Sequence, residues 1–276
     1  MSSRVRRTVL FAGGGTGGHL FPAVSIADRI RELAGEAMTV DISFVGTRRG
    51  LEYRLGESLG YPLHLINIRG FVRSFTMSNL LLPFIIVGAL IASWRLLRRL
   101  SPDLIVGSGG YVCWPVLKIA AMQKIPSVLQ EQNSFPGITT RQAAASASRI
   151  YLGFAEAKQH LHTRATIMIT GNPVRSAICR GARGRGLKAY GLDSRKKTIL
   201  ILGGSQGARA INRAVIGSLQ RCRLPDNIQL LWQTGKRDYT EVAMQMGSKV
   251  TGCSLFPFAE QMETVYAVAD LAIARA

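Results

Sequence analysis

Acidic residues and cysteines are both scarce in this sequence of 276 residues. Asp and Glu number 16 against 35 Lys and Arg, which leaves a formal net charge of +19. Such an excess favours anionic partners, among them nucleic acid, an anionic membrane surface and phosphorylated substrates. Alternatively, the positive charge reflects the arginine-rich composition that GC-rich genomes encode, because much of the excess of basic residues is arginine spread along the chain.

Several familiar motifs are also missing. The four cysteines form no CxxC pair, which argues against a zinc ribbon or a redox motif and predicts a reducing compartment. The apolar run Thr8–Ala12 is too short for the hydrophobic region of a signal peptide, so we expect a cytoplasmic chain. No DxD or GK[ST] segment and no aromatic-interleaved basic motif occurs. We therefore expect no metal, no cofactor and no nucleic-acid partner.

Short runs rich in Val, Ile and Leu alternate with helical patterns along the chain. In Pro22–Ala34, apolar residues recur at helical spacing along one face. Short apolar strands separated by helices are typical of a doubly wound parallel sheet in an α/β protein. The predicted strands are Thr8–Ala12, Thr39–Val45, Leu63–Ile68, Asp103–Val106, Ser127–Leu129, Arg149–Phe154, Thr166–Thr170, Thr198–Leu202, Gln229–Gln233, Cys253–Phe256 and Leu271–Ile273.

The beginning of this pattern occurs twice. "TVLFAGGGTGGH" at residues 8–19 and "TILILGGSQGA" at residues 198–208 both predict a strand, a glycine-rich turn and a helix. We therefore expect two Rossmann-like domains, 1–170 and 171–276, that join near "GNPVR". The second domain reaches about four strands, and a parallel strand normally needs a covering helix and a neighbour. We expect it to be incomplete in this chain.

The first glycine turn has the composition of a phosphate-binding loop. Such a turn lets backbone N–H groups approach a phosphate, and the following helix N-terminus adds partial positive charge. Gly13, Gly15 and Gly18 form GxGxxG, but the second strand ends in Val45–Arg49 without an acid. Because a dinucleotide site would place a carboxylate there, a nicotinamide or flavin cofactor is disfavoured.

His19 ends the first turn, whereas the corresponding residue of the second turn is Ala208. Since the turn can be built without histidine, His19 is interpreted as a chemical group. A helix N-terminus favours the neutral imidazole, which suits a general base near neutral pH. A capping or hydrogen-bonding histidine is the alternative.

Six segments together carry a family resemblance. "GGGTGGHLFPA", "FVGTRRGLE", "LIVGSGGYV", "QEQNSFPG", "GNPVR" and "LGGSQGARAIN" occur in the order seen in the MurG family. The resemblance implies a GT-B fold of two Rossmann-like domains. It also implies inverting transfer of N-acetylglucosamine (GlcNAc) from UDP-GlcNAc to the C4 hydroxyl of undecaprenyl-pyrophosphoryl-N-acetylmuramyl-pentapeptide, on the cytoplasmic face of the cell membrane.

The resemblance also implies roles for individual residues. His19 is the candidate base, and Glu131 is a second catalytic candidate, so the choice between them stays open. An acceptor-binding or cleft role falls to Gly14, Gly15 and Tyr111. Donor-binding roles fall to Thr16, Gly17, Gly18, Asn133, Arg175, Ser205, Gln206 and Ala259.

Two departures from the family pattern bear on activity. Gln130 stands where the family usually has His, so an imidazole role is not expected there. A segment of the family that holds the ribose and the GlcNAc ring would follow Ala276. We therefore expect this polypeptide alone to be an inactive or very weak transferase. The alternative is one subunit of another GT-B nucleotide-sugar transferase that acts on a lipid-linked acceptor.

The stretch Met77–Leu100 is the most apolar part of the chain. Its uncharged portion, Met77–Trp94, has 18 residues, which is marginal for a spanning helix. A tryptophan followed by arginines is typical of a helix at the membrane interface. The residues expected to contact an anionic inner-membrane surface are Leu81, Phe84, Ile85, Trp94, Arg95 and Arg98. A buried helix of the first domain is the alternative.

Overall fold

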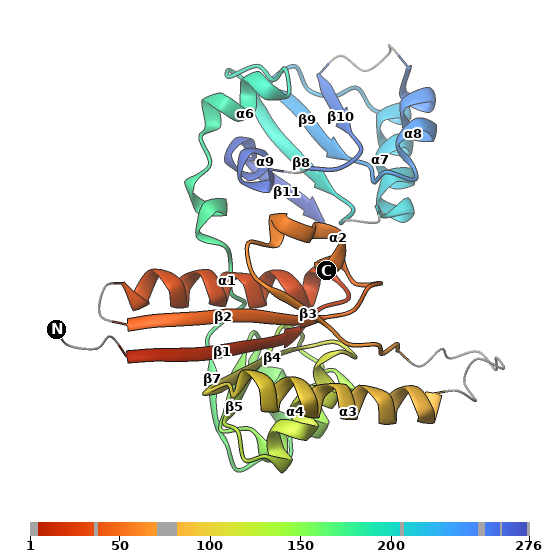
Figure 1. Ribbon diagram of the computed structural model, residues 1–276. Coiled ribbons are helices and arrows are strands. Elements are labelled where there is room, and N and C mark those ends of the chain that lie inside the picture. The colour runs from red at the N-terminus through yellow and green to blue at the C-terminus, as the bar shows by residue number, and fades with distance from the viewer. Residues whose placement is uncertain are drawn as a thin grey trace. The chain divides into compact units, whose positions relative to one another are not determined.

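The computed structural model describes residues 5–35, 38–70, 82–204, 207–247, 252–259 and 261–274. The chain divides into two compact units, Met1–Arg175 and Ser176–Ala276 (Figure 1). The sequence placed the join at residues 170 and 171. Residues 171–175 lie with the first unit because the Asn172 side chain donates to the Gln132 carbonyl and Arg175 lies over the Phe21 ring.

The first unit is built on a seven-stranded parallel sheet with the order β3-β2-β1-β4-β5-β6-β7. The strand order reverses at β1, whose neighbours are β2 and β4. In open α/β sheets, ligands bind beyond the carboxyl ends of the strands at such a switch point. The strands are β1 (Val5–Gly13), β2 (Met38–Gly46), β3 (Leu63–Leu65), β4 (Leu104–Gly109), β5 (Ser127–Glu131), β6 (Arg149–Leu152) and β7 (Thr166–Ile169).

Helices cover both faces of this sheet. In Figure 1, α1 lies on one side of β1 and β2, and α3 and α4 lie on the other. The helical elements are α1 (Gly17–Ala34), α2 (Leu51–Leu55), η1 (Gly56–Leu59), α3 (Leu82–Leu100), α4 (Cys113–Met122), α5 (Ile138–Ala143), η3 (Ala144–Ser146) and η4 (Ala155–His160).

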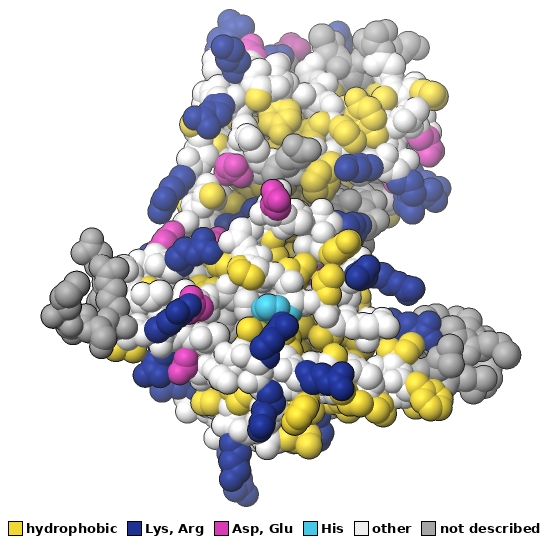
Figure 2. Space-filling view, in the orientation of Figure 1, with side chains coloured by type: hydrophobic (Ala, Val, Ile, Leu, Met, Phe, Trp, Pro, Cys, Tyr) yellow, Lys and Arg dark blue, Asp and Glu magenta, His cyan; other side chains and the backbone are white. Residues whose placement is uncertain are grey.

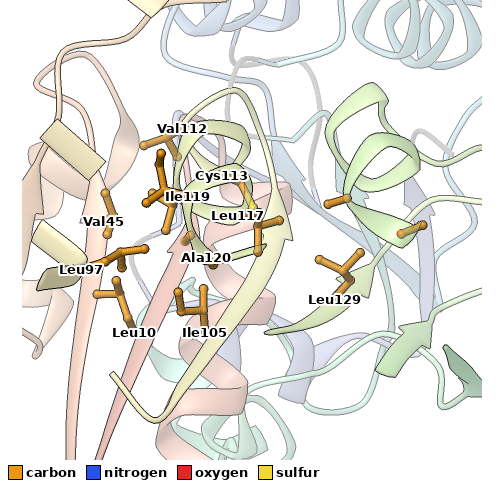
Figure 3. Packing of buried hydrophobic residues seen from close by; sticks show 14 of the residues in the cluster. Leu10, Val45, Leu97, Ile105, Val112, Cys113, Leu117, Ile119, Ala120 and Leu129 are labelled. Atoms are coloured by element: carbon orange, nitrogen blue, oxygen red, sulfur yellow. The ribbon is translucent and has the colours of Figure 1, made fainter. Parts of the chain in front are cut away.

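The buried half of β1, residues Val9–Ala12, shows why that part of the strand is uniformly apolar. Val9 and Phe11 pack into the cluster under α1, whereas Leu10 and Ala12 pack into the cluster under α3 and α4 (Figure 3). Successive side chains of a strand point to opposite faces, and both faces of this sheet are buried. The central strand therefore has no polar alternation.

The second unit repeats this design with a four-stranded parallel sheet in the order β10-β9-β8-β11. One hydrophobic cluster includes residues of α9, and the other includes residues of α7 and α8. The elements are η5 (Ser176–Arg180), α6 (Arg183–Ala189), β8 (Lys197–Leu202), α7 (Arg209–Arg221), β9 (Ile228–Gln233), α8 (Tyr239–Met246), β10 (Cys253–Phe256), α9 (Met262–Val268) and β11 (Leu271–Ala274).

The doubly wound α/β class predicted from the sequence is confirmed in both units. Each of the eleven predicted strand ranges overlaps an observed strand. The first helix begins at Gly17 rather than Pro22, because the glycines and His19 form its first turn.

Candidate active site

The glycine turn of the first unit follows β1 at the switch point of the sheet. Gly15 has a φ of +85°, a left-handed conformation that glycine adopts without a steric penalty. Thr16 occupies the N-cap position of α1, its side chain makes no capping hydrogen bond, and the first turn contains no acidic residue. The first N–H groups of a helix have no intrahelical partner. The turn, which includes Gly17 and Gly18, is therefore suited to an anionic group.

A buried carboxylate holds this turn in place. Glu52, at the start of α2, is fully buried, and its two oxygens accept from the backbone N–H groups of Gly15 at 2.8 Å and Thr47 at 2.9 Å. A Cβ on Gly14 or Gly50 would lie 2.6 or 1.9 Å from a Glu52 carboxylate oxygen. The sequence reasoning assigned Glu52 no role, although it ends the segment "FVGTRRGLE". An acid does lie near the end of β2, but backbone N–H groups engage it.

His19 lies in the first turn of α1, and its contacts determine which ring nitrogen carries the proton. Its Nδ1 is 3.0 Å from the backbone oxygen of Ser108 and 3.0 Å from Oε1 of Gln132. A carbonyl oxygen can only accept, so Nδ1 carries the proton in the neutral ring. Nε2 then keeps its lone pair, which is what a general base needs.

Strand β4 and the loop after it pack against this histidine. The Ser108 hydroxyl donates to the His19 carbonyl at 2.9 Å. Gly109 has a φ of +100°, and a Cβ there would lie 2.7 Å from the His19 Nδ1. Tyr111 lies over Gly15, and its hydroxyl is 3.4 Å from the Thr47 hydroxyl. Tyr111 and His19 are therefore brought to the same edge of the sheet.

Two other predicted residues, Glu131 at the end of β5 and Asn133 in the loop after it, form a separate local network. Glu131 is 1% exposed, and its carboxylate accepts from the Asn133 backbone N–H at 3.1 Å, the Asn133 side-chain amide at 2.8 Å and the Gly137 N–H at 3.2 Å. These bonds fix the loop of residues 131–137. The Glu131 carboxylate is thus engaged within the loop, while Asn133 itself is exposed.

The segment "GNPVR" reaches the same edge. The Asn172 side chain donates to the Gln132 carbonyl at 3.1 Å. The Arg175 guanidinium lies 4.9 Å from the centroid of the Phe21 ring on α1. Ser108, Gln132 and Asn172 were not singled out from the sequence, although each lies inside a quoted family segment.

The second glycine turn has the same strand–turn–helix geometry. Gly204 and Gly207 have φ values of +75° and +77°, and the Gln233 side-chain amide donates to the Gly204 carbonyl at 2.9 Å. Ser205 and Gln206 lie outside the described residues. Ala259 is 4% exposed and packs in the cluster that includes α9 residues.

Helix α3 has one buried and one exposed apolar face. Ala89, Ser93, Leu96 and Leu97 are buried, which agrees with the helix belonging to the first-unit core. Its exposed apolar residues Phe84, Val87, Ile91 and Trp94 recur at helical spacing. Ile85 is half-buried, Arg95 and Arg98 are exposed, and Leu81 lies outside the described residues. Figure 2 shows hydrophobic side chains beside Lys and Arg along this edge.

Two further observations concern the described part of the chain. No group of three His, Cys, Asp or Glu side chains there is placed to hold a metal ion. None of the described helices combines the length and apolarity that crossing a bilayer requires.

Known proteins match this chain along most of its length. The glycosyltransferase family 28 N-terminal domain matches residues 9–152, and the C-terminal domain of the same family matches residues 198–276. An enzyme of Chlorobium limicola is 40% identical over 97% of this chain and 73% of its own length. One of Halothermothrix orenii is 39% identical over the same shares. Both are named UDP-N-acetylglucosamine--N-acetylmuramyl-(pentapeptide) pyrophosphoryl-undecaprenol N-acetylglucosamine transferase.

Two solved structures are similar to this chain. MurG of Acinetobacter baumannii is 26% identical with a TM-score of 0.68, covering 98% of this chain and 72% of that chain. A UDP-GlcNAc 2-epimerase of Neisseria meningitidis has a TM-score of 0.67 at 14% identity, covering 98% of this chain and 77% of that chain, and shares the fold. By its two family domains and its relatives at about 40% identity, this chain belongs to glycosyltransferase family 28 and, within it, to the MurG family.

Proposed function

We propose that this chain is an inverting glycosyltransferase that transfers GlcNAc from UDP-GlcNAc to the C4 hydroxyl of undecaprenyl-pyrophosphoryl-N-acetylmuramyl-pentapeptide, in peptidoglycan precursor synthesis. Its relatives at 39–40% identity are named for this transfer. The observation that carries the mechanism is the His19 ring, whose Nδ1 proton is engaged by two acceptors. That arrangement leaves Nε2 to receive a proton.

In this mechanism Nε2 of His19 removes the proton of the C4 hydroxyl as its oxygen attacks the anomeric carbon of GlcNAc. The new glycosidic bond forms as the bond to the UDP oxygen breaks, and UDP leaves with that electron pair from the opposite face. The stereochemistry at the anomeric carbon is therefore inverted. A base matched to this task accelerates such a step by about 10²–10⁴-fold.

The departing diphosphate needs positive or N–H stabilisation. We assign this role to the first turn of α1 with Thr16, Gly17 and Gly18, and to Arg175, together with Ser205 and Gln206. Asn133 and Ala259 are assigned to the rest of the donor, and Gly14, Gly15 and Tyr111 to the acceptor side.

His19 is preferred over Glu131 as the base. The Glu131 carboxylate is buried and accepts from two backbone N–H groups and one amide. Both oxygens of this carboxylate are therefore occupied by donors of its own loop. Glu131 is therefore assigned the role of fixing the 131–137 loop that presents Asn133.

Kinetics of two variants test this assignment. His19→Gln is expected to lower kcat at least about 100-fold while the affinity for UDP-GlcNAc stays within a few-fold. Glu131→Gln is expected to raise KM for the donor and to leave the acid limb of the pH–rate profile in place. A His19→Gln variant with wild-type kcat would overturn the mechanism, and so would an acid limb that disappears in Glu131→Gln.

We also propose that the chain is a peripheral protein of the inner membrane surface, where the lipid-linked acceptor resides. The exposed face of α3 supplies apolar contacts through Phe84 and Trp94, and its C-terminal end supplies Arg95 and Arg98. Ile85 and Leu81 are assigned to the same contact. Interfacial helices bind membranes through two contributions that act together, insertion of apolar side chains and attraction of basic side chains to anionic lipid.

Vesicle sedimentation distinguishes this proposal from a helix that serves only the core. The wild type is expected to bind vesicles rich in anionic lipid at low salt, and Phe84→Ser with Trp94→Ser is expected to reduce binding at least about tenfold. Exposed Met244→Ser on α8 is the matched control. Equal binding of wild type and double variant would exclude α3 as the contact.

A further inference from the structure

The Gln132 side chain has one orientation that satisfies its surroundings. One end of its amide faces the backbone oxygens of Ser108 at 2.9 Å and Gln130 at 3.2 Å, together with the Gln130 side-chain oxygen. Because the two backbone oxygens can only accept, that end must be the NH2 group. The other end is then Oε1, the atom that lies 3.0 Å from the His19 Nδ1.

This glutamine is also held rigidly. It is 9% exposed, and its backbone oxygen accepts from the Asn172 side chain at 3.1 Å. Each described contact of Gln132 therefore fixes either its backbone or its amide. An acceptor fixed in this way restricts rotation of the ring that donates to it.

We propose that Gln132 is a positioning residue that, together with the Ser108 carbonyl, accepts from the His19 Nδ1–H and thereby orients the imidazole. The inference rests on the proposed role of His19 as the base. In many active sites a third group orients the catalytic base and stabilises the cation that forms when the base takes a proton. Gln132 would have this role toward His19.

A neutral amide has a specific chemical consequence in this position. It accepts from Nδ1–H without adding a negative charge, so it orients the imidazole without strongly favouring the protonated ring before reaction. The charged or titratable side chains that the surrounding described elements bring to this edge are engaged elsewhere: Glu52 with Gly15 and Thr47, Tyr111 with Thr47, Glu131 with Asn133 and Gly137, and Arg175 with Phe21.

Two substitutions separate positioning from simple structural support. Gln132→Met keeps the length of the side chain but removes its acceptor, so kcat is expected to fall by about tenfold to a hundredfold with little change in KM. Gln132→Glu keeps an oxygen beside Nδ1, and its second oxygen faces the backbone oxygens of Ser108 and Gln130, so the carboxyl group is expected to retain a proton at that end. Gln132→Glu is therefore expected to keep kcat within a few-fold of wild type, unlike Gln132→Met.

The matched control is Gln229→Met, which removes another buried amide with three hydrogen bonds, in the second unit. It is expected to lower stability without lowering kcat in the way that Gln132→Met does. Circular dichroism establishes that each variant is folded at the temperature used.

The readout that does not depend on turnover is nitrogen-detected NMR of the imidazole, assigned by the signal lost in His19→Gln. The wild type should show a protonated Nδ1 and a bare Nε2 at high pH. Wild-type kcat in Gln132→Met, or a kcat in Gln132→Glu as low as that in Gln132→Met, would overturn the positioning role. Absent turnover in the wild type with the expected NMR result would instead count against the proposed function alone.

Discussion

At the scale of single residues, Glu52 is the contact on which the first glycine turn depends. Its carboxylate accepts from Gly15 and Thr47 and is fully buried. Glu52→Gln keeps the shape but replaces one acceptor oxygen with an NH2 group, so one backbone N–H loses its partner. We expect the free energy of unfolding to fall by about 1–3 kcal/mol, with a loss of activity because the turn is displaced. Urea unfolding and initial rates measure both effects.

Glu57→Gln is the matched control for this variant, because Glu57 is an exposed acid in the adjacent 3-10 helix η1. It removes the same charge without touching the turn, and a change within about 0.5 kcal/mol is expected. If both variants lower stability equally, net charge rather than the hydrogen bonds of Glu52 explains the result.

Residues of this kind show where sequence reasoning ends. His19 could be predicted as a chemical group because the repeated turn has Ala208 in its place. Glu52 and Gln132 could not be found by comparing the two turns in this way. Their importance arises from hydrogen-bond partners 37 and 24 positions away in the sequence, Gly15 and Ser108. A buried carboxylate that accepts only backbone N–H groups has no partner whose side chain could indicate it in a sequence.

At the scale of elements, helix α3 combines a membrane-like composition with a role in the core. Ser93 lies on the core face of the helix and is 0% exposed. Its hydroxyl has no hydrogen-bond partner among the described residues. Ser93→Ala removes this polar atom and improves helix propensity. We expect the free energy of unfolding to rise by about 1 kcal/mol, measured as a higher urea midpoint with an unchanged m-value.

Two variants on the same helix calibrate this prediction. Leu97→Ala creates a cavity at a residue that is 1% exposed and should cost about 2–5 kcal/mol. Ile91→Ala on the exposed face should change stability by less than about 0.5 kcal/mol. A destabilising Ser93→Ala would mean that the hydroxyl has a partner in solution.

Strands were easier to predict than helix boundaries, and α1 and α3 show why. The C-terminal half of a central strand such as β1 is apolar because both of its faces are covered. The start of α1 at Gly17 depends on a turn that glycine permits rather than on propensity. The composition of α3 is compatible with lipid and with a core, and packing decides which residues face inward. Burial of Ala89, Ser93, Leu96 and Leu97 confirms that one face belongs to the core, and the proposed membrane contact concerns the exposed face that carries Phe84 and Trp94.

At the scale of the whole molecule, three of the scarce acids hold basic side chains or backbone N–H groups in the second unit. In the second unit, hydrogen bonds from Arg195 lower the pKa of Asp193 to about 2. Burial opposes ionisation of Asp238, but hydrogen bonds and charge from Arg237 and Arg209 lower its pKa overall. The backbone N–H of Thr198, followed by Arg183 and Lys197, lowers the pKa of Asp270 to about 2.

Asp270 connects three segments of the second unit immediately before β11. It accepts from the Thr198 N–H at 2.8 Å, Arg183 at 3.1 Å and Lys197 at 3.2 Å. Its pKa is lower in the folded chain than the ordinary value of 3.8. Its contribution to stability is therefore complete above about pH 4 and is lost as the pH falls towards 2.

Asp270→Asn is expected to lower the free energy of unfolding of the second unit at pH 7 by roughly 1–2 kcal/mol, allowing for solvent screening. The difference from wild type should shrink as the pH falls from about 4 towards 2, since the wild-type carboxylate is then protonated too. The chain has three tryptophans, and Trp232 is fully buried in this unit. Urea titrations with Trp94→Phe and Trp114→Phe in the background therefore report on Trp232 alone.

Exposed Asp226→Asn supplies the control, because it removes the same charge from the same unit. If the difference in the free energy of unfolding between wild type and Asp270→Asn stays constant from pH 7 to pH 2, the side chain stabilises the unit by shape and not by charge. A gap that closes on acidification, with none for Asp226→Asn, would show that in a chain of net charge +19 this carboxylate stabilises its unit by holding two basic side chains and a strand N–H together.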